Sequence, residues 1–174
     1  MEQDNLVKSY YMGILKCLSY VFIMVGVVTV LPAFLTFFYR DEMKYMWCFV
    51  FPGILYIFLG YFIRLCTENY SVTNFKRNSG SLVVLLLWIL SITLGAVPFA
   101  MTKDYTFLQA LFESTSGFTT TGFTVTDVAN APHMILMYRS LLHLVGGVGL
   151  VLILSLALSK TFWRIKYILW NSKT

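Results

Sequence analysis

The chain has 174 residues, of which 58% are hydrophobic, 17% are aromatic and only 12% are charged. Soluble domains are about half apolar and about one quarter charged. This composition therefore excludes an ordinary soluble protein and indicates a chain that lies in the lipid bilayer. The net charge of +5 would suggest nucleic acid as the partner of a soluble protein. In a membrane protein the distribution of basic residues over the loops explains the charge better, and we expect no nucleic-acid partner.

Four stretches of the sequence contain no Asp, Glu, Lys or Arg: residues 17–39, 45–63, 78–102 and 140–159. A helix needs about 20 apolar residues to cross the hydrocarbon core of a bilayer, and each stretch meets this length. A cleaved secretory signal is the alternative for the first stretch, but the stretch exceeds a signal core and no small-x-small cleavage site follows it. The sequence therefore predicts an all-α integral membrane protein.

The basic residues give an orientation. Nine of the 13 fall in the segments that lie on the same side as the N-terminus: Lys8, Lys16, Arg64, Lys76, Arg77, Lys160, Arg164, Lys166 and Lys173. The other four are Arg40, Lys44, Lys103 and Arg139. Because cytoplasmic loops carry the excess of Lys and Arg, we expect both termini to be cytoplasmic and the segment 102–139 to begin and end outside.

The first two apolar stretches predict a helical hairpin over residues 1–70. Its polar start, residues 1–16, is expected to be a cytoplasmic lead-in, and Pro32 is expected to kink the first span, residues 17–38. A compact outer turn, residues 40–44, carries charges that cancel. With no polar cluster inside its spans, this hairpin is expected to pack and anchor.

The pattern after residue 78 is different, because a short polar segment separates two apolar spans. Asp104 or Thr106 can cap a helix over residues 105–116, and Gly117 is well placed to end it. Such a helix is about 18 Å long, which is too short to cross the bilayer. The chain must therefore re-enter and return through residues 118–126 before the last span, 140–159.

The returning segment is rich in threonine and glycine. Irregular backbone at membrane depth is tolerated only where protein buries it or where it lines a water-filled cavity. Carbonyl oxygens of such residues can replace the water shell of a monovalent cation. Gly122 allows a backbone shape that a Cβ would penalise. The preceding helix directs the negative end of its dipole at this segment, which would favour a cation there. An ordinary exposed loop remains the alternative interpretation of this segment. The sequence shows no acid–base pair, activated nucleophile or metal cluster that would indicate an enzyme.

Four segments carry a resemblance to a known family: GAVPF at 95–99, ALFESTSGFTTTG at 110–122, YRSLLH at 138–143 and GGVG at 146–149. Together they resemble the helix, pore loop and helix unit of the Trk/Ktr/HKT potassium transporter superfamily, most closely its TrkH type. The resemblance covers residues 75–155, and the preceding hairpin is similar to the extra N-terminal helix pair of TrkH proteins.

The resemblance implies roles for individual residues. Thr119, Thr120, Thr121, Gly122 and Phe123 match the selectivity filter, in which the backbone carbonyls of Thr120, Thr121 and Gly122 would bind K⁺. Gly122 occupies a position where glycine accompanies potassium preference and serine accompanies sodium preference. Glu113, Gly117 and Arg139 look like support for the pore loop, and Glu113 is expected to pair with a basic residue or with backbone donors. The implied cargo is K⁺, with no cofactor in this chain.

The family pattern has four such repeats around one pore, on a dimer that binds a cytoplasmic nucleotide-binding ring, whereas this sequence holds the first repeat only. Residues 1–70 are thus expected to form the hairpin, 71–160 the pore-loop repeat and 161–174 a basic cytoplasmic tail, in a bacterial inner membrane. The pore would be completed by the remaining repeats or by further copies of the chain. The alternative is a non-conducting remnant or accessory subunit.

Overall fold

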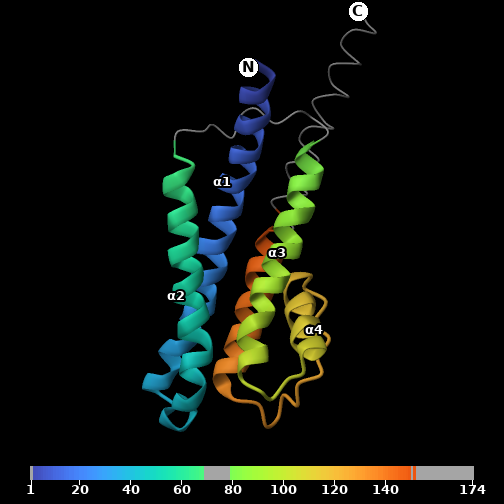
Figure 1. Cartoon of the computed structure of the whole chain (residues 1–174). Coiled ribbons are helices and arrows are strands. Elements are labelled where there is room, and N and C mark those ends of the chain that lie inside the picture. The colour runs from blue at the N-terminus through green and yellow to red at the C-terminus, as the bar shows by residue number, and fades with distance from the viewer. Residues whose placement is uncertain (1, 69–78, 150, 152–174) are drawn as a thin grey trace, which may run out of the picture.

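A computed structural model describes residues 2–68, 79–149 and 151, and these residues contain helices and no strand. The elements are α1 (Glu2–Val30), the 3-10 helices η1 (Leu31–Phe37) and η2 (Arg40–Glu42), α2 (Met43–Cys66), α3 (Ser79–Met101), α4 (Phe107–Phe118) and a last helix over residues 133–149 (Figure 1). Among the described residues, three spans, Tyr11–Phe37, Arg40–Cys66 and Val83–Met101, are long and apolar enough to cross a membrane. The predicted all-α membrane fold is confirmed.

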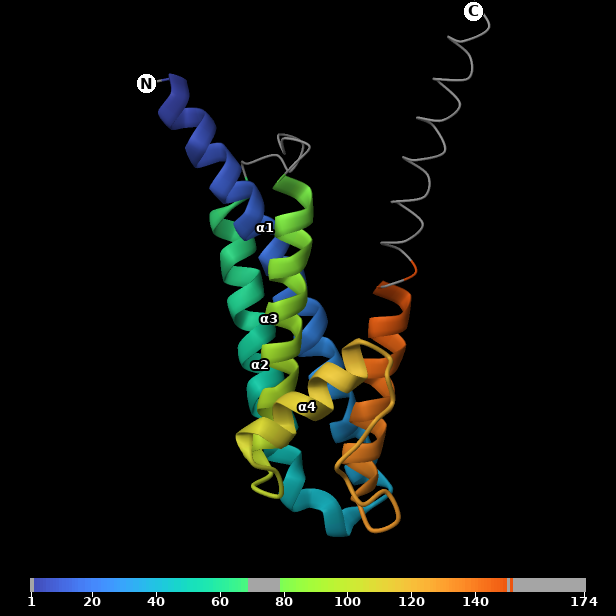
Figure 2. The same ribbon diagram turned by 90° about the vertical axis from the view of Figure 1, so that its right-hand side faces the viewer.

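The long helices lie side by side, and α4 lies obliquely across α3 and the last helix, on the side of the bundle away from α2 (Figures 1 and 2). We call the end of the bundle that holds residues 38–42 and 102–106 the turn end. From the turn end α4 enters the bundle and stops part of the way along it, and the chain returns to the turn end before the last helix begins (Figure 2). The predicted re-entry is therefore present in the fold.

The structure adds two details to the predicted hairpin. Helix α1 already begins at Glu2, so the segment predicted as a polar lead-in, residues 1–16, is helical from Glu2 onward. At Pro32 the chain does not simply kink but continues as the 3-10 helix Leu31–Phe37. Proline lacks the N–H of a regular α-helical turn, and the tighter 3-10 turn replaces the α-helix from this point.

The proline of α3 ties the hairpin to the rest of the bundle. Pro98 has no N–H to donate to Leu94, four residues earlier, so the Leu94 carbonyl needs another donor. The Tyr56 hydroxyl of α2 donates to it at 3.2 Å. Beside it the hydroxyl of Tyr138, a fully buried residue of the last helix, donates to the Gly95 carbonyl at 3.1 Å. Three helices thus meet at the carbonyls around Pro98.

The last helix begins earlier than predicted. It is helical from residue 133, not from residue 140, so Arg139 lies inside a helix and is 9% exposed. A buried partner, described below, compensates the charge of the Arg139 guanidinium within the bundle. The far half of the span predicted over 140–159, most of the linker before α3 and the basic tail 161–174 lie outside the described residues.

Candidate ion-filter loop

The start of α4 is fixed by its own sequence. The Thr106 hydroxyl accepts from the Gln109 backbone N–H at 3.4 Å, and the Gln109 side chain accepts from the Thr106 N–H at 2.9 Å. This reciprocal capping box satisfies two N–H groups that a helix terminus leaves without partners. Thr106, rather than Asp104, is the cap, and the 12 residues of α4 extend about 18 Å.

The end of α4 does not lie at Gly117, and that prediction is wrong. The helix continues to Phe118 and closes with two bonds: Thr121 N–H donates to the Ser116 carbonyl and Thr120 N–H to the Gly117 carbonyl, both at 3.0 Å. This is the Schellman pattern, whose turning residue adopts a left-handed backbone. Here that residue is Thr120, with φ of +56°. A β-branched residue in this region is strained, and such strain is concentrated at functional sites.

Gly117 serves packing instead of termination. A Cβ on Gly117 would lie 2.8 Å from the Cβ of Leu142 in the last helix, and a Cβ on Gly146 would overlap the Phe118 carbonyl. The last helix therefore lies directly against the C-terminal turn of α4. Glycine permits this contact because it has no side chain to intervene.

Residues 119–123, which we call the filter stretch, follow this contact and are exposed. Gly122 has φ of +82°, and the nearest atom to a Cβ there would be 4.0 Å away, so backbone shape rather than space requires glycine. Within the described part of the chain, the carbonyls of Thr120, Thr121 and Gly122 accept no hydrogen bond. Three successive carbonyl oxygens are thus available to an external partner.

The far end of the filter stretch is tied back to α4. The Ser116 hydroxyl donates to the Phe123 carbonyl at 2.6 Å, although the Phe123 side chain is 70% exposed. This bond turns the Phe123 carbonyl toward α4. It sets the boundary between the open carbonyls and the part of the loop that the protein holds.

Residues 124–126, which we call the return arm, are bound to one carboxylate. Glu113 is 1% exposed, and its Oε1 accepts from four donors. They are Thr124 Oγ1 at 2.6 Å, Val125 N at 2.8 Å, Thr126 N at 3.2 Å and Thr126 Oγ1 at 2.9 Å. A buried side chain of α4 thus fixes the chain as it leaves the filter stretch.

The second oxygen of this carboxylate faces Arg139. Arg139 Nε lies 2.8 Å from Glu113 Oε2, as an ion pair whose N–H direction is poorly aligned for a hydrogen bond. The pair gives the buried carboxylate a compensating charge, without which burial would be strongly unfavourable. The pairing expected for Glu113 is present, and it links α4, the return arm and the last helix.

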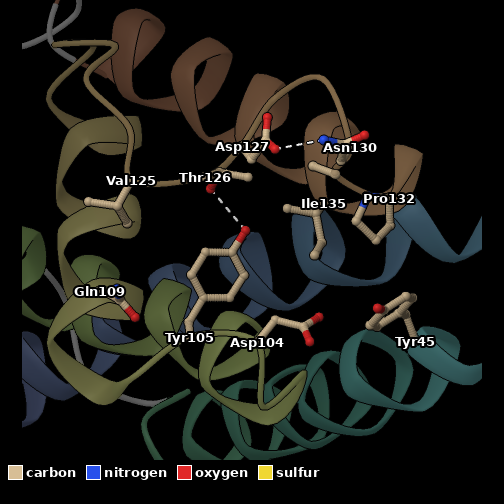
Figure 3. A pocket seen from close by; sticks show the side chains of 11 residues that line it. Tyr45, Asp104, Tyr105, Gln109, Val125, Thr126, Asp127, Asn130, Pro132 and Ile135 are labelled. Carbon is tan, nitrogen blue, oxygen red and sulfur yellow. Dashed lines mark hydrogen bonds between the residues drawn. The ribbon is translucent and has the colours of Figure 1, made fainter.

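A cavity of about 330 Å³ lies at the turn end beneath the return arm (Figure 3). The Tyr105 hydroxyl shares a hydrogen bond of 2.9 Å with Thr126 Oγ1 at its edge, and burial raises the pKa of this phenol. The carboxylates of Asp104 and Asp127 line this cavity. The Asp127 carboxylate accepts a hydrogen bond from the Asn130 side chain at 2.7 Å. Among the described residues no group of three or more His, Cys, Asp or Glu could hold a metal ion.

The predicted site residues therefore converge on one loop. Thr119 to Phe123 form its exposed part, while Glu113, Gly117 and Arg139 lie beneath it on α4 and the last helix. Sequence reasoning missed Ser116 and the return arm. The bond from the Ser116 hydroxyl to the Phe123 carbonyl joins residues seven apart, a spacing that no sequence pattern predicts. The many hydroxyl side chains in 114–126 were nevertheless a signal that several of them bind the loop itself.

The chain is similar in sequence to known cation transport proteins. The sequence model of TrkH, described as a cation transport protein, matches residues 49–174. The chain belongs to the TrkH family. The matched range covers α2 from residue 49 onward, α3, α4, the loop and the last helix.

Individual TrkH relatives support the same assignment. An uncharacterized cation transporter of Methanocaldococcus jannaschii is 28% identical over 171 residues, which is 97% of this chain and 35% of the relative. The Trk system potassium uptake protein TrkG of Escherichia coli is 31% identical over 70% of this chain and 25% of the relative. TrkH of Escherichia coli is 40% identical over 45% of this chain and 17% of the relative. The chain thus spans about a third or less of these curated relatives.

Proposed function

We propose that the chain takes part in potassium transport across a membrane and supplies one of four filter segments of a Trk-type uptake system. The observation that carries this proposal is the set of open carbonyls at Thr120, Thr121 and Gly122, exposed at the end of a half-length helix. Bare carbonyls at membrane depth need water or an ion as partner. A dehydrated cation is such a partner.

Two features of the loop suit a cation. The C-terminal end of α4 directs about half a negative charge toward the filter stretch, which attracts positive ions. The bonds of Glu113 and Ser116 hold both the return arm and the Phe123 carbonyl, so the open carbonyls are presented by a loop that is fixed at its edges. Preorganised oxygens do not have to be reoriented when an ion loses its water.

Potassium is the proposed cargo. TrkG and TrkH of Escherichia coli are potassium uptake proteins by name, and Gly122 is the residue type that the family resemblance associates with potassium preference. We assign K⁺ to the carbonyls of Thr120, Thr121 and Gly122, with Thr119 and Phe123 at the two ends. We propose neither an enzymatic role nor a cofactor.

The proposed surroundings follow from the same resemblance. The bilayer would be a bacterial inner membrane with both termini in the cytoplasm, and the turn end would face outward. Further repeats or further copies of the chain would supply the other filter segments, and a cytoplasmic nucleotide-binding ring would be the regulatory partner. The exposed filter stretch is consistent with neighbours that complete a pore around it.

Growth of a potassium-uptake-deficient bacterium on low potassium tests the proposal. The chain is expressed alone, and also as a fusion that replaces the matching quarter of Escherichia coli TrkG. We expect the fusion to restore growth and K⁺ uptake. Failure of both proteins, with normal membrane insertion, would contradict the proposal and favour a non-conducting accessory subunit. Growth with the chain alone would add that copies of it assemble into a pore.

Ion selectivity in the same fusion tests the assigned residues. We expect Gly122→Ser to lower the ratio of K⁺ to Na⁺ uptake, because a side chain at φ of +82° disturbs the carbonyls beside it. Gly149→Ser is the matched control, since no atom lies within 4 Å of a Cβ at that position. An unchanged ratio in Gly122→Ser would remove Gly122 from the filter.

A further inference from the structure

We propose that Glu42, in the turn of the N-terminal hairpin, is a positioning residue for the filter loop. The hairpin would then do more than pack and anchor: its turn would set the start of the helix that carries Arg139. This inference rests on the proposed function for its consequence in transport, but its structural part can be tested separately.

Glu42 lies in η2, and its carboxylate binds the first turn of the last helix. Oε1 accepts from the His133 backbone N–H at 2.8 Å, and Oε2 accepts from the Met134 backbone N–H at 2.9 Å. The first N–H groups of a helix have no partner within it, and a negative charge at this terminus is stabilising. Glu42 is therefore a helix cap supplied from 91 residues away in sequence.

The His133 side chain strengthens the same junction. Its Nδ1 lies 2.8 Å from Glu42 Oε1, and its ring stacks on the ring of Tyr39 with centroids 3.9 Å apart and planes 10° from parallel. Tyr39 and Glu42 both belong to the hairpin turn, so this turn holds one residue of the last helix by its backbone, its ring face and its ring nitrogen. The turn does not merely neutralise its own charges, as the sequence suggested.

The junction lies on a short path to the filter. Arg139 follows His133 by six residues, about 9 Å along the helix axis. Arg139 then pairs with Glu113, whose other oxygen binds Val125 and Thr126 of the return arm. Each of these contacts shares a residue or a helix with the next. A shift of the first turn of the last helix would therefore move Arg139 and loosen the return arm.

Hydrogen exchange of the full chain in lipid nanodiscs tests this path. We expect Glu42→Ala to raise the exchange rate of the His133 and Met134 amides about fivefold, the typical effect of losing a helix cap, and also to raise that of Val125 and Thr126. Glu42→Gln, which keeps one acceptor oxygen, should give a smaller effect. Asp41→Ala is the control, because Asp41 is the neighbouring acid and is exposed.

Two results would overturn the proposal. Unchanged exchange at Val125 and Thr126, with faster exchange at His133 and Met134, would limit Glu42 to a local cap. Equal increases in exchange rate in Asp41→Ala and Glu42→Ala would show that the net charge of the turn, and not the Glu42 contacts, causes the change. Both results can be read even if the chain transports nothing, so failure of the proposed function is distinguishable.

The transport readout is the ratio of K⁺ to Na⁺ uptake in the TrkG fusion. A residue that only stabilises the fold changes the amount of working protein, but the ratio per working pore stays the same. We expect Glu42→Ala to lower the ratio and Asp41→Ala to leave it unchanged. A Glu42→Ala protein with reduced uptake and an unchanged ratio would contradict a positioning role.

Discussion

The filter stretch and the return arm are adjacent in sequence and rich in the same residue types, but a buried carboxylate binds the return arm alone. In the return arm, one buried carboxylate accepts from four donors on Thr124, Val125 and Thr126. In the filter stretch, the described contacts leave the carbonyls of Thr120, Thr121 and Gly122 without a donor. The protein thus binds the N–H and hydroxyl groups of the loop and leaves a row of its oxygens open.

This difference shows how a flexible-looking segment can present oxygens in a fixed arrangement. Glu113 binds the return arm at the far end of the loop, and the Schellman turn at Thr120 fixes the end of the loop that follows α4. The backbone strain at Thr120 is maintained by these contacts, since nothing in a threonine favours φ of +56°. Substitutions at the residues that hold the loop should therefore alter the carbonyls of Thr120, Thr121 and Gly122.

The largest effect is expected for Glu113→Ala, which would leave Arg139 buried without its counter-charge. Breaking a buried ion pair costs about 3–5 kcal/mol, and the return arm also loses its acceptor. We expect a much lower unfolding temperature in detergent and loss of uptake in the TrkG fusion.

The double variant Glu113→Leu with Arg139→Met separates these two causes. Replacing both charges by apolar side chains is often neutral for stability, so the part of the loss that comes from the unpaired Arg139 charge should be recovered in the unfolding temperature. Uptake should not recover, because the donors of the return arm remain without an acceptor. Recovery of both would mean that the carboxylate only balances charge.

An intermediate effect is expected for Gly146→Ala. Its Cβ would overlap the Phe118 carbonyl at the start of the filter stretch, and overpacking of this kind costs about 1–3 kcal/mol. Gly149→Ala in the same helix is the control, and with no neighbour within 4 Å it should be neutral or slightly stabilising. Equal unfolding temperatures of the two variants would show that the contact between α4 and the last helix is not tight.

A smaller effect is expected for Ser116→Ala, which removes the bond to the Phe123 carbonyl. Loss of one such bond is worth about 1 kcal/mol, and it would extend the open row of carbonyls by one. We expect reduced selectivity for K⁺ with modest destabilisation, measured as uptake ratios and unfolding temperatures. Ser140→Ala, an exposed serine that bonds only its own helix, should change neither quantity.

The smallest effect on stability is expected for Thr120→Gly. Glycine removes a left-handed strain of about 1–2 kcal/mol but adds about 0.4–1 kcal/mol of unfolded-chain entropy, so the two nearly offset each other. Selectivity should nevertheless fall, because the carbonyl of residue 120 becomes less restricted. A stable and fully selective variant would show that the strain has no part in ion choice.

Much of this organisation could be read from the sequence, because it depends on local composition. Uncharged apolar stretches indicated the hairpin and α3, the Thr106 capping signal located α4, and the short length of α4 required a return. Gly122 was identified because a positive φ favours one residue type. These features are properties of a few neighbouring residues, so no tertiary information was needed.

The errors fall where distant residues decide the structure. Gly117 has the identity of a helix stop, yet its contact with Leu142 keeps it within α4 and moves the turn to Thr120. Arg139 was placed just outside the last span, yet it lies buried inside the last helix, where Glu113 compensates its charge. Glu42 looked like part of a balanced charge cluster, and a cap that acts over 91 residues leaves no local pattern.

The proposed ion site can be tested by locating the ion in the completed pore. Crystals of the TrkG fusion soaked in thallium, an electron-dense substitute for potassium, would show bound cations by anomalous scattering. We predict density in contact with the carbonyls of Thr120, Thr121 and Gly122. Density confined to the cavity beside Asp104 and Asp127, with none at these carbonyls, would contradict it.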